Sequence, residues 1–322
     1  MLVLVTGATG FLGAHIVRTL LAQNDKVRAL VRPGSARNHI RKLGVEFIEG
    51  NLLDEKVMEK ACEGVDAIIH CAALLSYWSR QNAMQYSTNV DGVSILLRAA
   101  HKARVRRIVH VSSVAAVGAT RNGEVLDESA VWNLHGAGVH YAHTKHQGEQ
   151  RMLAAAWGGM PIVVVNPSSM FGPRLDGRPP SPLITGIMRG RLPWIPPGGV
   201  SITDVSDVAA ACVRAQRAGT PGSRYILAGH NVTWEQLYNS IADAADGRLP
   251  KLKLTARRLR MLKILATCRD KLRLSRPPWT PELYRSYGSY SWYRSAKAER
   301  ELSYSVRSLR LIIRHAIGRE LP

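Results

Sequence analysis

Three residues suit proton exchange with an alcohol or a ketone: Ser113, Tyr141 and Lys145. Tyr141 and Lys145 are four positions apart in a segment with a helical pattern, so their side chains leave the same helix face. A tyrosine phenol has a pKa of about 10, and a neighbouring cation lowers it by stabilising the phenolate. We therefore expect Tyr141 to exchange a proton with a substrate oxygen while Ser113 hydrogen-bonds that oxygen and a cofactor carries the hydride.

A glycine-rich segment near the start of the sequence could hold such a cofactor. Leu2–Val5 is an apolar run typical of a buried parallel strand, and an amphipathic helical pattern follows the glycines. Between them, Gly7 permits a tight turn, Gly10 lets the backbone approach a ligand, and Gly13 allows close packing of the helix on the strand. The pattern predicts a dinucleotide whose pyrophosphate lies at the helix N-terminus; the alternative is a glycine turn without a ligand.

The residue after the second strand indicates which dinucleotide is bound. The predicted strand Val27–Val31 is followed by Arg32, near the place where an acidic residue would bind the ribose hydroxyls of NAD. An arginine suits the 2′-phosphate of NADP instead, with Arg37 as a second candidate. NADP(H) is favoured on this ground, with NAD(H) and a solvated loop arginine as the alternative.

Strands and helices alternate through the first half of the chain. We expect further strands at Val45–Ile48, Ala67–His70, Val105–Val111 and Pro161–Val165, and helices at Glu55–Cys62, at Met84–Lys102 and from Tyr141 onward. This alternation predicts an α/β fold, a Rossmann-type doubly wound parallel sheet. The small residues Cys71, Ala72 and Ala73 leave room for a cofactor to cross the end of the fourth strand, and His70 is expected to be a packed histidine.

The alternation stops at Gly172, where a proline-rich stretch begins. Such a stretch is typical of a smaller C-terminal substrate-binding lobe. Regular elements are expected within it at Val205–Arg217, Tyr225–Leu227 and Trp234–Ala245. The predicted division is a nucleotide-binding domain over residues 1–170, to which 200–217 and 223–228 return, and a substrate-binding lobe over 171–322.

The net charge of +20 is concentrated near the C-terminus. Residues 247–322 contain 19 Lys and Arg against five Asp and Glu. Within them, Leu252–Leu274 is predicted to form a helix with apolar residues such as Met261 and Leu265 on one face and basic residues on the other. We favour a lid whose apolar face covers the substrate; the alternative is peripheral contact with an anionic membrane surface. The basic surface would also suit a phosphorylated, CoA-linked or lipid-like substrate, or an acidic carrier protein.

Other patterns exclude several classes of protein. No stretch approaches the roughly 18 apolar residues of a membrane span, and no secretion signal is recognisable, so a cytoplasmic protein is expected. The four cysteines form no C-x-x-C pair and are expected to be buried thiols. His140, His143 and His146 lack a completing carboxylate or thiolate, so no metal site is expected. No nucleic-acid-binding motif accompanies the positive charge.

Short motifs occur along nearly the whole chain. They are T-G-A-T-G-F-L-G at Thr6–Gly13, H-C-A-A at His70–Ala73, V-S-S-V-A-A-V-G ending at Gly118, Y-A-H-T-K from Tyr141, N-P-S-S-M-F-G-P at Asn166–Pro173, D-V-A at Asp207–Ala209 and S-A-K-A-E-R-E-L-S-Y at Ser295–Tyr304. Together they resemble the extended short-chain dehydrogenase/reductases, the superfamily of NAD-dependent epimerases and dehydratases. L-V-R-P at Leu30–Pro33, V-N-P at Val165–Pro167 and R-Y-I-L-A-G at Arg224–Gly229 most resemble the hopanoid-associated sugar epimerase and dihydroflavonol-reductase-like branch.

The resemblance implies a role for each matching residue. Ser113, Tyr141 and Lys145 would be the catalytic set, Pro167 and Ser168 would border the nicotinamide, and an arginine at position 32 accompanies NADP(H). Many members have aspartate where this chain has Asn51, so the adenine contact there is altered. The implied cofactor contacts are Thr6, Gly7, Thr9, Gly10, Phe11, Leu12, Arg32, Asn51, Leu52, Cys71, Ala72, Ala73, Tyr141, Lys145, Pro167 and Ser168.

The resemblance leaves three functions open. The first is an NADP(H)-linked oxidoreductase that interconverts a ketone and a secondary alcohol on a sizeable small-molecule substrate. The second is an epimerase or dehydratase that oxidises and re-reduces a sugar-like substrate with no net redox change. The third is a non-catalytic regulator that senses the nucleotide. Helices near Met84 and Tyr141 match those with which similar proteins form homodimers.

Overall fold

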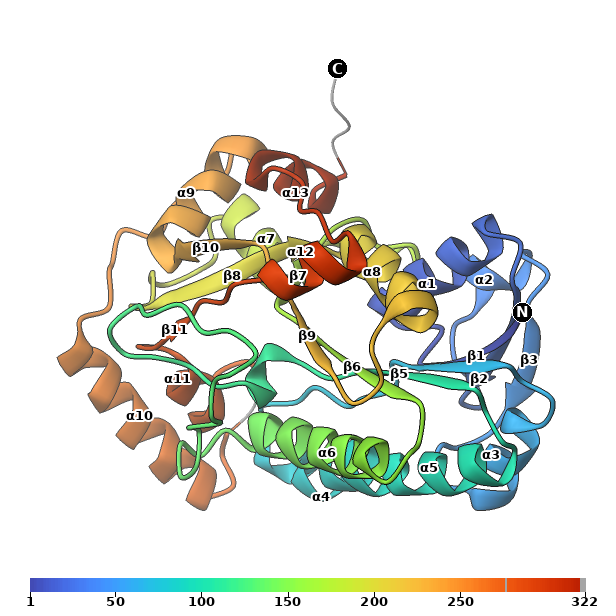
Figure 1. The fold of residues 1–322 in the computed structure, drawn as a ribbon. Helices are drawn as coiled ribbons and strands as arrows, with labels where there is room; N and C mark the ends of the chain where they lie inside the picture. The colour runs from blue at the N-terminus through green and yellow to red at the C-terminus, as the bar shows by residue number, and fades with distance from the viewer. Residues whose placement is uncertain (276, 319–322) are drawn as a thin grey trace.

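The computed structural model describes residues 1–275 and 277–318, and its centre is a seven-stranded parallel sheet (Figure 1). The strand order is β3-β2-β1-β4-β5-β6-β9. These strands are β1 (Leu2–Thr6), β2 (Lys26–Val31), β3 (Glu46–Glu49), β4 (Ala67–His70), β5 (Arg107–Val111), β6 (Ile162–Pro167) and β9 (Arg224–Leu227). The predicted doubly wound sheet is confirmed. The order reverses between β1 and β4, where sheets of this kind bind their ligands.

Helices cover both faces of this sheet (Figure 1). Val3 and Val5 of β1 belong to a core formed with α1 (Phe11–Ala22) and α8 (Val205–Ala218). Leu4 belongs to the opposite core, because successive strand side chains point to opposite faces. That second core is formed with α3 (Glu55–Cys62), α5 (Gly92–Lys102) and α6 (His140–Trp157).

A second, four-stranded sheet lies in the C-terminal half. It contains β7 (Ser169–Phe171), β8 (Gly199–Asp204), β10 (His230–Thr233) and β11 (Tyr290–Ser291), and α7 (Pro182–Met188), α9 (Trp234–Ala245) and α13 (Leu309–Ala316) pack against it. The sequence did not predict β7, β8, β10 or β11, since they are short and two lie among prolines and glycines. β6 ends at Pro167 and β7 begins at Ser169, so Ser168 connects the two sheets.

The helix predicted at Met84–Lys102 is present as one continuous helical run over residues 82–102, with a π-helical segment that the sequence did not predict. The chain forms α4 (Asn82–Tyr86), a π-helical segment at Ser87–Asp91, and then α5. The π-helical segment contains Asn89, whose amide oxygen accepts from Leu74 N (2.7 Å) and whose amide nitrogen donates to Thr144 Oγ1 (3.0 Å). The segment thereby ties the loop after β4 to α6. Shorter elements are α2 (Asn38–Arg41), 3₁₀ turns at Ser79–Gln81 and Val114–Ala116, α11 (Pro281–Ser286) and α12 (Ala296–Leu302).

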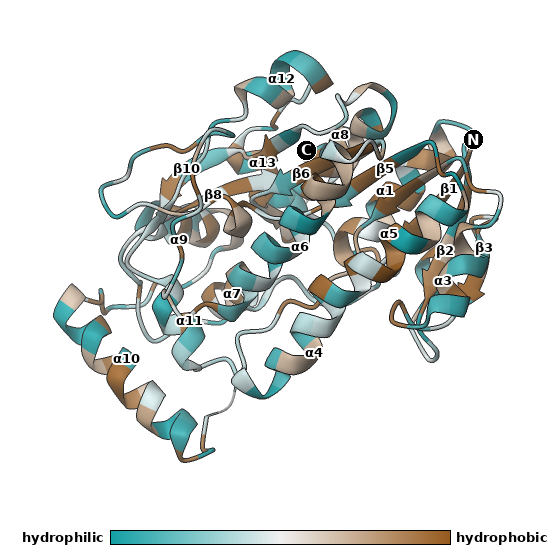
Figure 2. Cartoon of the chain, turned by 60° about the horizontal axis from the view of Figure 1, so that its bottom comes forward, coloured by the Kyte–Doolittle hydropathy of each residue, from teal (hydrophilic) through white to brown (hydrophobic). Residues whose placement is uncertain are grey.

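The predicted basic helix is α10 (Ala256–Lys271), at the margin of the molecule (Figure 2). Its body-facing residues include Leu259 and Ala266, which are buried, whereas Met261 and Leu265 are 57% exposed. The prediction that the apolar face bearing Met261 and Leu265 covers the substrate is therefore wrong. No helix among residues 1–275 and 277–318 is long and apolar enough to cross a bilayer.

The cysteines also differ from expectation. Cys62 and Cys212 are buried, but Cys71 is half-buried and Cys268 of α10 is exposed. All four are free thiols. The prediction of four buried thiols holds for two of them.

Candidate active site

The β1–α1 turn is shaped by close backbone contacts that only glycine allows. Gly7 has φ +70°, and a Cβ there would lie 2.8 Å from Ala72 N at the end of β4. A Cβ on Gly13 would lie 2.1 Å from Gly7 O. Gly10 is the N-cap of α1 and offers no side-chain cap. The turn therefore leaves the positive end of α1 open beside the strand-order reversal, which fits a dinucleotide pyrophosphate.

Two residues in the implied cofactor set have side chains committed to the protein interior. Thr6 is fully buried, and its hydroxyl lies 2.7 Å from His70 Nδ1 and accepts from Ala72 N (3.2 Å). Leu52 is buried against Gly92, where a Cβ would lie 2.7 Å from Leu52 Cδ2. Their side chains thus join β1 to β4 and the α3 loop to α5.

The end of β2 presents the two arginines proposed for the NADP phosphate. Arg32 is exposed directly after β2, and no ion pair to it occurs among the described residues. Arg37 instead donates to Glu49 (3.1 Å), and its guanidinium lies 5.5 Å from the centre of the Phe47 ring. Asn51, on the next loop, accepts from Leu53 N (3.0 Å). Arg32 is therefore the arginine available to a phosphate, whereas Arg37 already has partners.

The end of β6 carries a buried hydroxyl without a partner. Ser168 is 5% exposed, and its Oγ has no hydrogen-bond partner among the described residues. A buried polar atom of this kind costs free energy unless a ligand or water satisfies it. An unpartnered hydroxyl at this sheet edge and the open glycine turn are both features that a bound dinucleotide would satisfy.

The catalytic candidates are brought together where β5 ends and α6 begins. Ser113 Oγ accepts from Ala115 N (3.2 Å), and the Ser113 side chain is close enough to the Tyr141 phenol to lower its pKa. Lys145 is buried one turn further along α6, and its Nζ donates to Val111 O of β5 (2.8 Å). Helical spacing and the strand end thus bring the three residues into one region, where the Lys145 ammonium bonds to β5.

The electrostatics of these groups differ from the expectation. Burial raises the pKa of Tyr141 above its usual value, opposed by the hydrogen bond from Ser113; Lys145 is not among the causes of the shift. Burial lowers the pKa of Lys145 to about 8, while Glu149 and Cys71 act in the opposite direction. Within the protein alone, the lysine therefore does not produce the predicted decrease in the tyrosine pKa.

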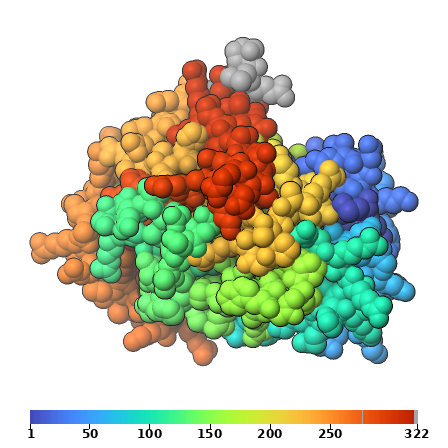
Figure 3. Space-filling view, viewed as in Figure 1, coloured from blue at the N-terminus to red at the C-terminus, as the bar shows by residue number. Residues whose placement is uncertain are grey.

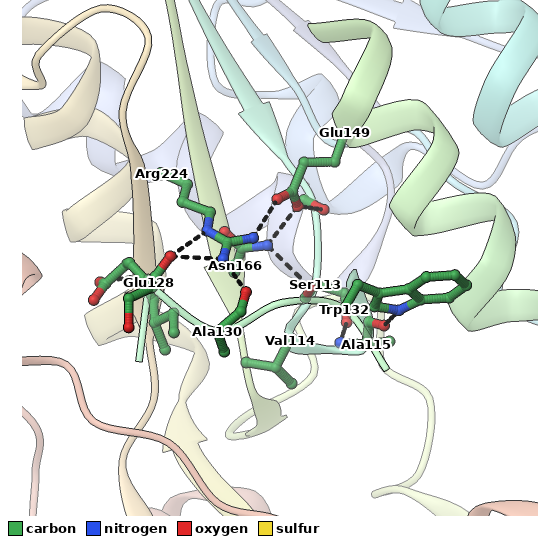
Figure 4. Close-up of polar contacts among 12 residues, drawn as sticks. Ser113, Val114, Ala115, Glu128, Ala130, Trp132, Glu149, Asn166 and Arg224 are labelled. Carbon is green, nitrogen blue, oxygen red and sulfur yellow. Dashed lines mark hydrogen bonds and ion pairs between the residues drawn. The ribbon is translucent and has the colours of Figure 1, made fainter. Parts of the chain in front are cut away.

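A buried polar network supports the loop that carries Ser113 (Figure 4). Glu149 of α6 is fully buried and accepts from Ser112 Oγ (2.5 Å) and Asn166 Nδ2 (2.6 Å). Asn166 of β6 also donates to the backbone oxygen of Ser113 (3.0 Å). Arg224 of β9 lies 3.4 Å from Glu149 and donates to Glu128 O and Ala130 O. The network ties the strand ends of β5, β6 and β9 to α6.

Sequence reasoning missed this network, although one signal was present. Glu149 follows Lys145 by four residues, so it lies on the same buried face of α6 as Tyr141 and Lys145. Burial raises the pKa of the Glu149 carboxyl, and the hydrogen bonds and Arg224 oppose that shift. An acid on the buried face of a helix needs partners, and this one finds them on three strands.

A pocket of about 370 Å³ lies at the start of α6, lined by His140 and His143 on either side of Tyr141 along the chain; Tyr141 itself is not part of its lining. Its wall includes Tyr77, whose ring lies 6.4 Å from the Tyr141 ring in an edge-on arrangement, and Glu282 of α11. The Glu282 carboxylate accepts from the backbone N–H of Tyr141 (2.9 Å) and so caps the first turn of α6. Nothing in the sequence pointed to Glu282, because 141 residues separate it from Tyr141.

Glu282 should make stability depend on pH. Burial raises its pKa to about 7, although the N–H groups of His140 and Tyr141 and the charge of Arg285 oppose the shift. The pKa of Glu282 is higher in the folded than in the unfolded state. The stability that this group contributes is therefore fully present below about pH 4.5 and is lost as the pH rises through about 7. In Glu282→Gln, which keeps the acceptor oxygen, we expect a flatter dependence of Tm on pH between 4.5 and 7.5. Parallel curves for both proteins would contradict this assignment.

The histidines considered as metal ligands have other partners. His140 Nδ1 lies 2.7 Å from Gln85 Oε1, and the His146 ring stacks on Trp132 with centroids 4.1 Å apart. No group of three or more His, Cys, Asp or Glu suited to a metal ion occurs in the described part of the chain. His70 is also packed: it stacks on His110, and burial lowers its pKa to about 3, which keeps it neutral.

Comparison with known proteins gives consistent matches. The profile of the NAD dependent epimerase/dehydratase family matches residues 3–228. A Synechocystis sp. protein that is named as a dihydroflavonol 4-reductase is 36% identical over 255 residues, which cover 77% of this chain and 73% of that protein. Sterol demethylase protein B of Methylococcus capsulatus is 33% identical over 267 residues, 82% of this chain and 81% of its own.

A solved structure extends the likeness to almost the whole chain. UDP-glucose-4-epimerase from Stenotrophomonas maltophila, with bound NAD and formylated UDP-arabinopyranose, superposes with a TM-score of 0.78. The match covers 99% of this chain and 97% of that one at 22% identity. At this identity the likeness concerns the fold, and it includes the second sheet that the sequence did not predict.

Proposed function

Because the chain belongs to the NAD-dependent epimerase/dehydratase family of extended short-chain dehydrogenase/reductases, we propose that it interconverts a ketone and a secondary alcohol with NADP(H). The observation that carries the proposal is the juxtaposition of Ser113 and Tyr141 where β5 ends and α6 begins, with Lys145 one turn further along α6. The reductase name of the Synechocystis relative supports the direction of the chemistry.

The mechanism assigns one role to each side chain. Ser113 Oγ hydrogen-bonds the substrate oxygen and holds it against Tyr141 Oη. In reduction, Tyr141 gives its proton to that oxygen; in oxidation it takes the proton back. A bound nicotinamide supplies or accepts the hydride. The raised pKa of Tyr141 keeps the phenol protonated and so able to donate in the reduction direction.

The residues that would hold the cofactor lie along the edge where β1, β2 and β6 end. The turn formed by Gly7, Gly10 and Gly13 would receive the pyrophosphate, and the unpartnered hydroxyl of Ser168 would face the nicotinamide end. Lys145 would contact the cofactor, as the resemblance implies, while its bond to Val111 fixes its position.

A second candidate is an epimerase or dehydratase with no net redox change, which the fold shared with UDP-glucose-4-epimerase favours. Stoichiometry separates the two reactions. With candidate ketones and NADPH, the reductase should consume one reduced nicotinamide per product formed. Product formation with no change in nicotinamide absorbance would establish the alternative and overturn the reductase proposal.

Cofactor choice should depend on Arg32. In Arg32→Gln, we expect kcat/KM for NADPH to fall by roughly 10- to 100-fold, because a charge-assisted bond to the 2′-phosphate is lost, while kcat/KM for NADH changes little. Arg37→Gln is the matched control and should have a smaller effect, since Arg37 is paired with Glu49. Equal losses with both cofactors in Arg32→Gln would argue against a phosphate contact.

A further inference from the structure

The helix α10 presents two opposite stripes of side chains. Leu259, Lys263, Ala266 and Asp270 recur at helical spacing on the side that meets the protein. Leu259 packs in a cluster with Leu254 and Tyr284. The other stripe contains Met261, Leu265, Cys268 and Leu272, and all four are exposed to solvent.

Polar contacts fix which stripe faces outward. Lys263 Nζ donates to Tyr287 O (3.3 Å), and Asp270 accepts from Ser79 Oγ (3.0 Å). Arg80 donates to Arg273 O just beyond the helix (2.7 Å). These bonds tether the inner stripe to both the α11 segment and the loop after β4. The apolar outer stripe therefore cannot turn inward without breaking them.

The outer stripe is large and apolar. Of its residues, Met261 and Leu265 are each 57% exposed and Leu272 is 69% exposed. Ile264 beside the stripe and Leu274 just beyond the helix add to it, with exposed fractions of 58% and 59%. Figure 2 shows α10 projecting at the edge of the molecule, and Figure 3 shows the orange residues around it along the left margin. Contiguous apolar side chains of this kind on an outer surface mark a contact site.

Positive charge lies on both sides of this stripe. Arg258 and Arg269 are exposed along one flank, and Arg257, Arg260 and Lys271 along the other. Residues 251–275 contain one acidic residue, Asp270, and it faces inward. An apolar ridge between basic flanks matches the interface of an anionic bilayer, where acyl chains lie beneath phosphates. The same flanks would repel a second copy of this basic chain.

We propose that α10 docks on the surface of an anionic lipid bilayer, with Met261, Leu265 and Leu272 entering the interface and the flanking Arg and Lys contacting lipid phosphates. Asp270 of α10 also lines the pocket at the start of α6. Docking therefore brings that pocket close to the lipid surface.

Vesicle binding by the full chain tests the proposal. We expect co-sedimentation with phosphatidylcholine vesicles that contain phosphatidylglycerol, weaker binding at high salt, and little binding to phosphatidylcholine alone. Arg257→Gln/Arg258→Gln/Arg260→Gln should weaken binding by about 100-fold, from about fivefold per charge, and Met261→Gln/Leu265→Gln by about tenfold. The charge-matched control Lys42→Gln/Lys56→Gln/Lys60→Gln alters exposed lysines elsewhere and should bind as the natural chain does.

A second readout distinguishes insertion from simple charge attraction. An environment-sensitive fluorophore on the exposed Cys268 should shift to shorter wavelength with anionic vesicles. Unchanged Tm in each variant shows that folding is intact. The proposal fails if nothing sediments at low salt or if Met261→Gln/Leu265→Gln binds normally, which indicates a polyanion site. It also fails if that variant instead dissociates a dimer in sedimentation velocity, because the stripe would then contact a second copy.

Discussion

Replacing Tyr141 with Phe should reduce kcat by roughly 100- to 10,000-fold, the usual contribution of a general acid or base. The substitution removes only the hydroxyl that is proposed to exchange the proton, while the ring keeps its place against Tyr77. Cofactor affinity, measured by fluorescence titration with NADPH, should remain within about twofold, since the loss concerns proton transfer and not binding.

Tyr77→Phe is the matched control for this experiment. Tyr77 lines the pocket at the start of α6 and packs edge-on against the Tyr141 ring, with the ring centroids 6.4 Å apart, so its variant loses the same chemical group from a neighbouring ring. We expect its kcat to stay within about tenfold of the natural chain, the scale of one lost hydrogen bond. Turnover that survives in Tyr141→Phe, or an equal loss in Tyr77→Phe, would remove Tyr141 from the proposed role.

Replacing Glu149 with Ala should lower the free energy of unfolding by roughly 3–5 kcal/mol, the cost of breaking a buried charged network by removing one partner. Ser112 and Asn166 lose their acceptor, and Arg224 loses its buried carboxylate. Chemical denaturation measures the difference. Activity should fall as well, because Asn166 also holds the backbone of Ser113.

Two neighbouring variants control for helix effects and for charge. Gln150→Ala changes the next, exposed residue of α6 and should stay within about 0.5 kcal/mol. Glu149→Gln keeps an acceptor oxygen for Ser112 or Asn166 and should lie between the natural chain and Glu149→Ala. A Glu149→Ala protein as stable as Gln150→Ala would mean that the network contributes nothing to folding.

The first half of the fold was predictable because its signals are local. The run at Leu2–Val5, the glycines after it and the pattern at Glu55–Cys62 specify strand, turn and helix within a few residues of each other. The second sheet was not predictable in this way. β8 pairs with β7, β10 and β11, which lie up to about ninety residues away and are two to four residues long. Pairing between distant short strands leaves little periodicity to read.

The residues of the candidate site also differ in whether local sequence spacing could reveal them. Tyr141 and Lys145 share a helix turn, so their spacing revealed them, and Ser113 followed from the strand end. Glu282 reaches the site from a distant segment, and only the folded chain shows its bond to Tyr141. The direction in which α10 faces was equally hidden: both stripes have helical spacing, and the contacts of Asp270 with Ser79 and of Arg273 with Arg80 decide between them.

The hydrogen bond from Tyr141 N to Glu282 also bears on the order in which the protein folds during synthesis. The first turn of α6 has backbone N–H donors that its own helix cannot satisfy. One of them, Tyr141 N, is satisfied by the carboxylate of Glu282, which is 141 residues later in the sequence. During synthesis the nucleotide-binding strands emerge first and can pair before α11 exists. The first turn of α6 therefore gains this acceptor only after residue 282 has been made, later than the strands of the central sheet.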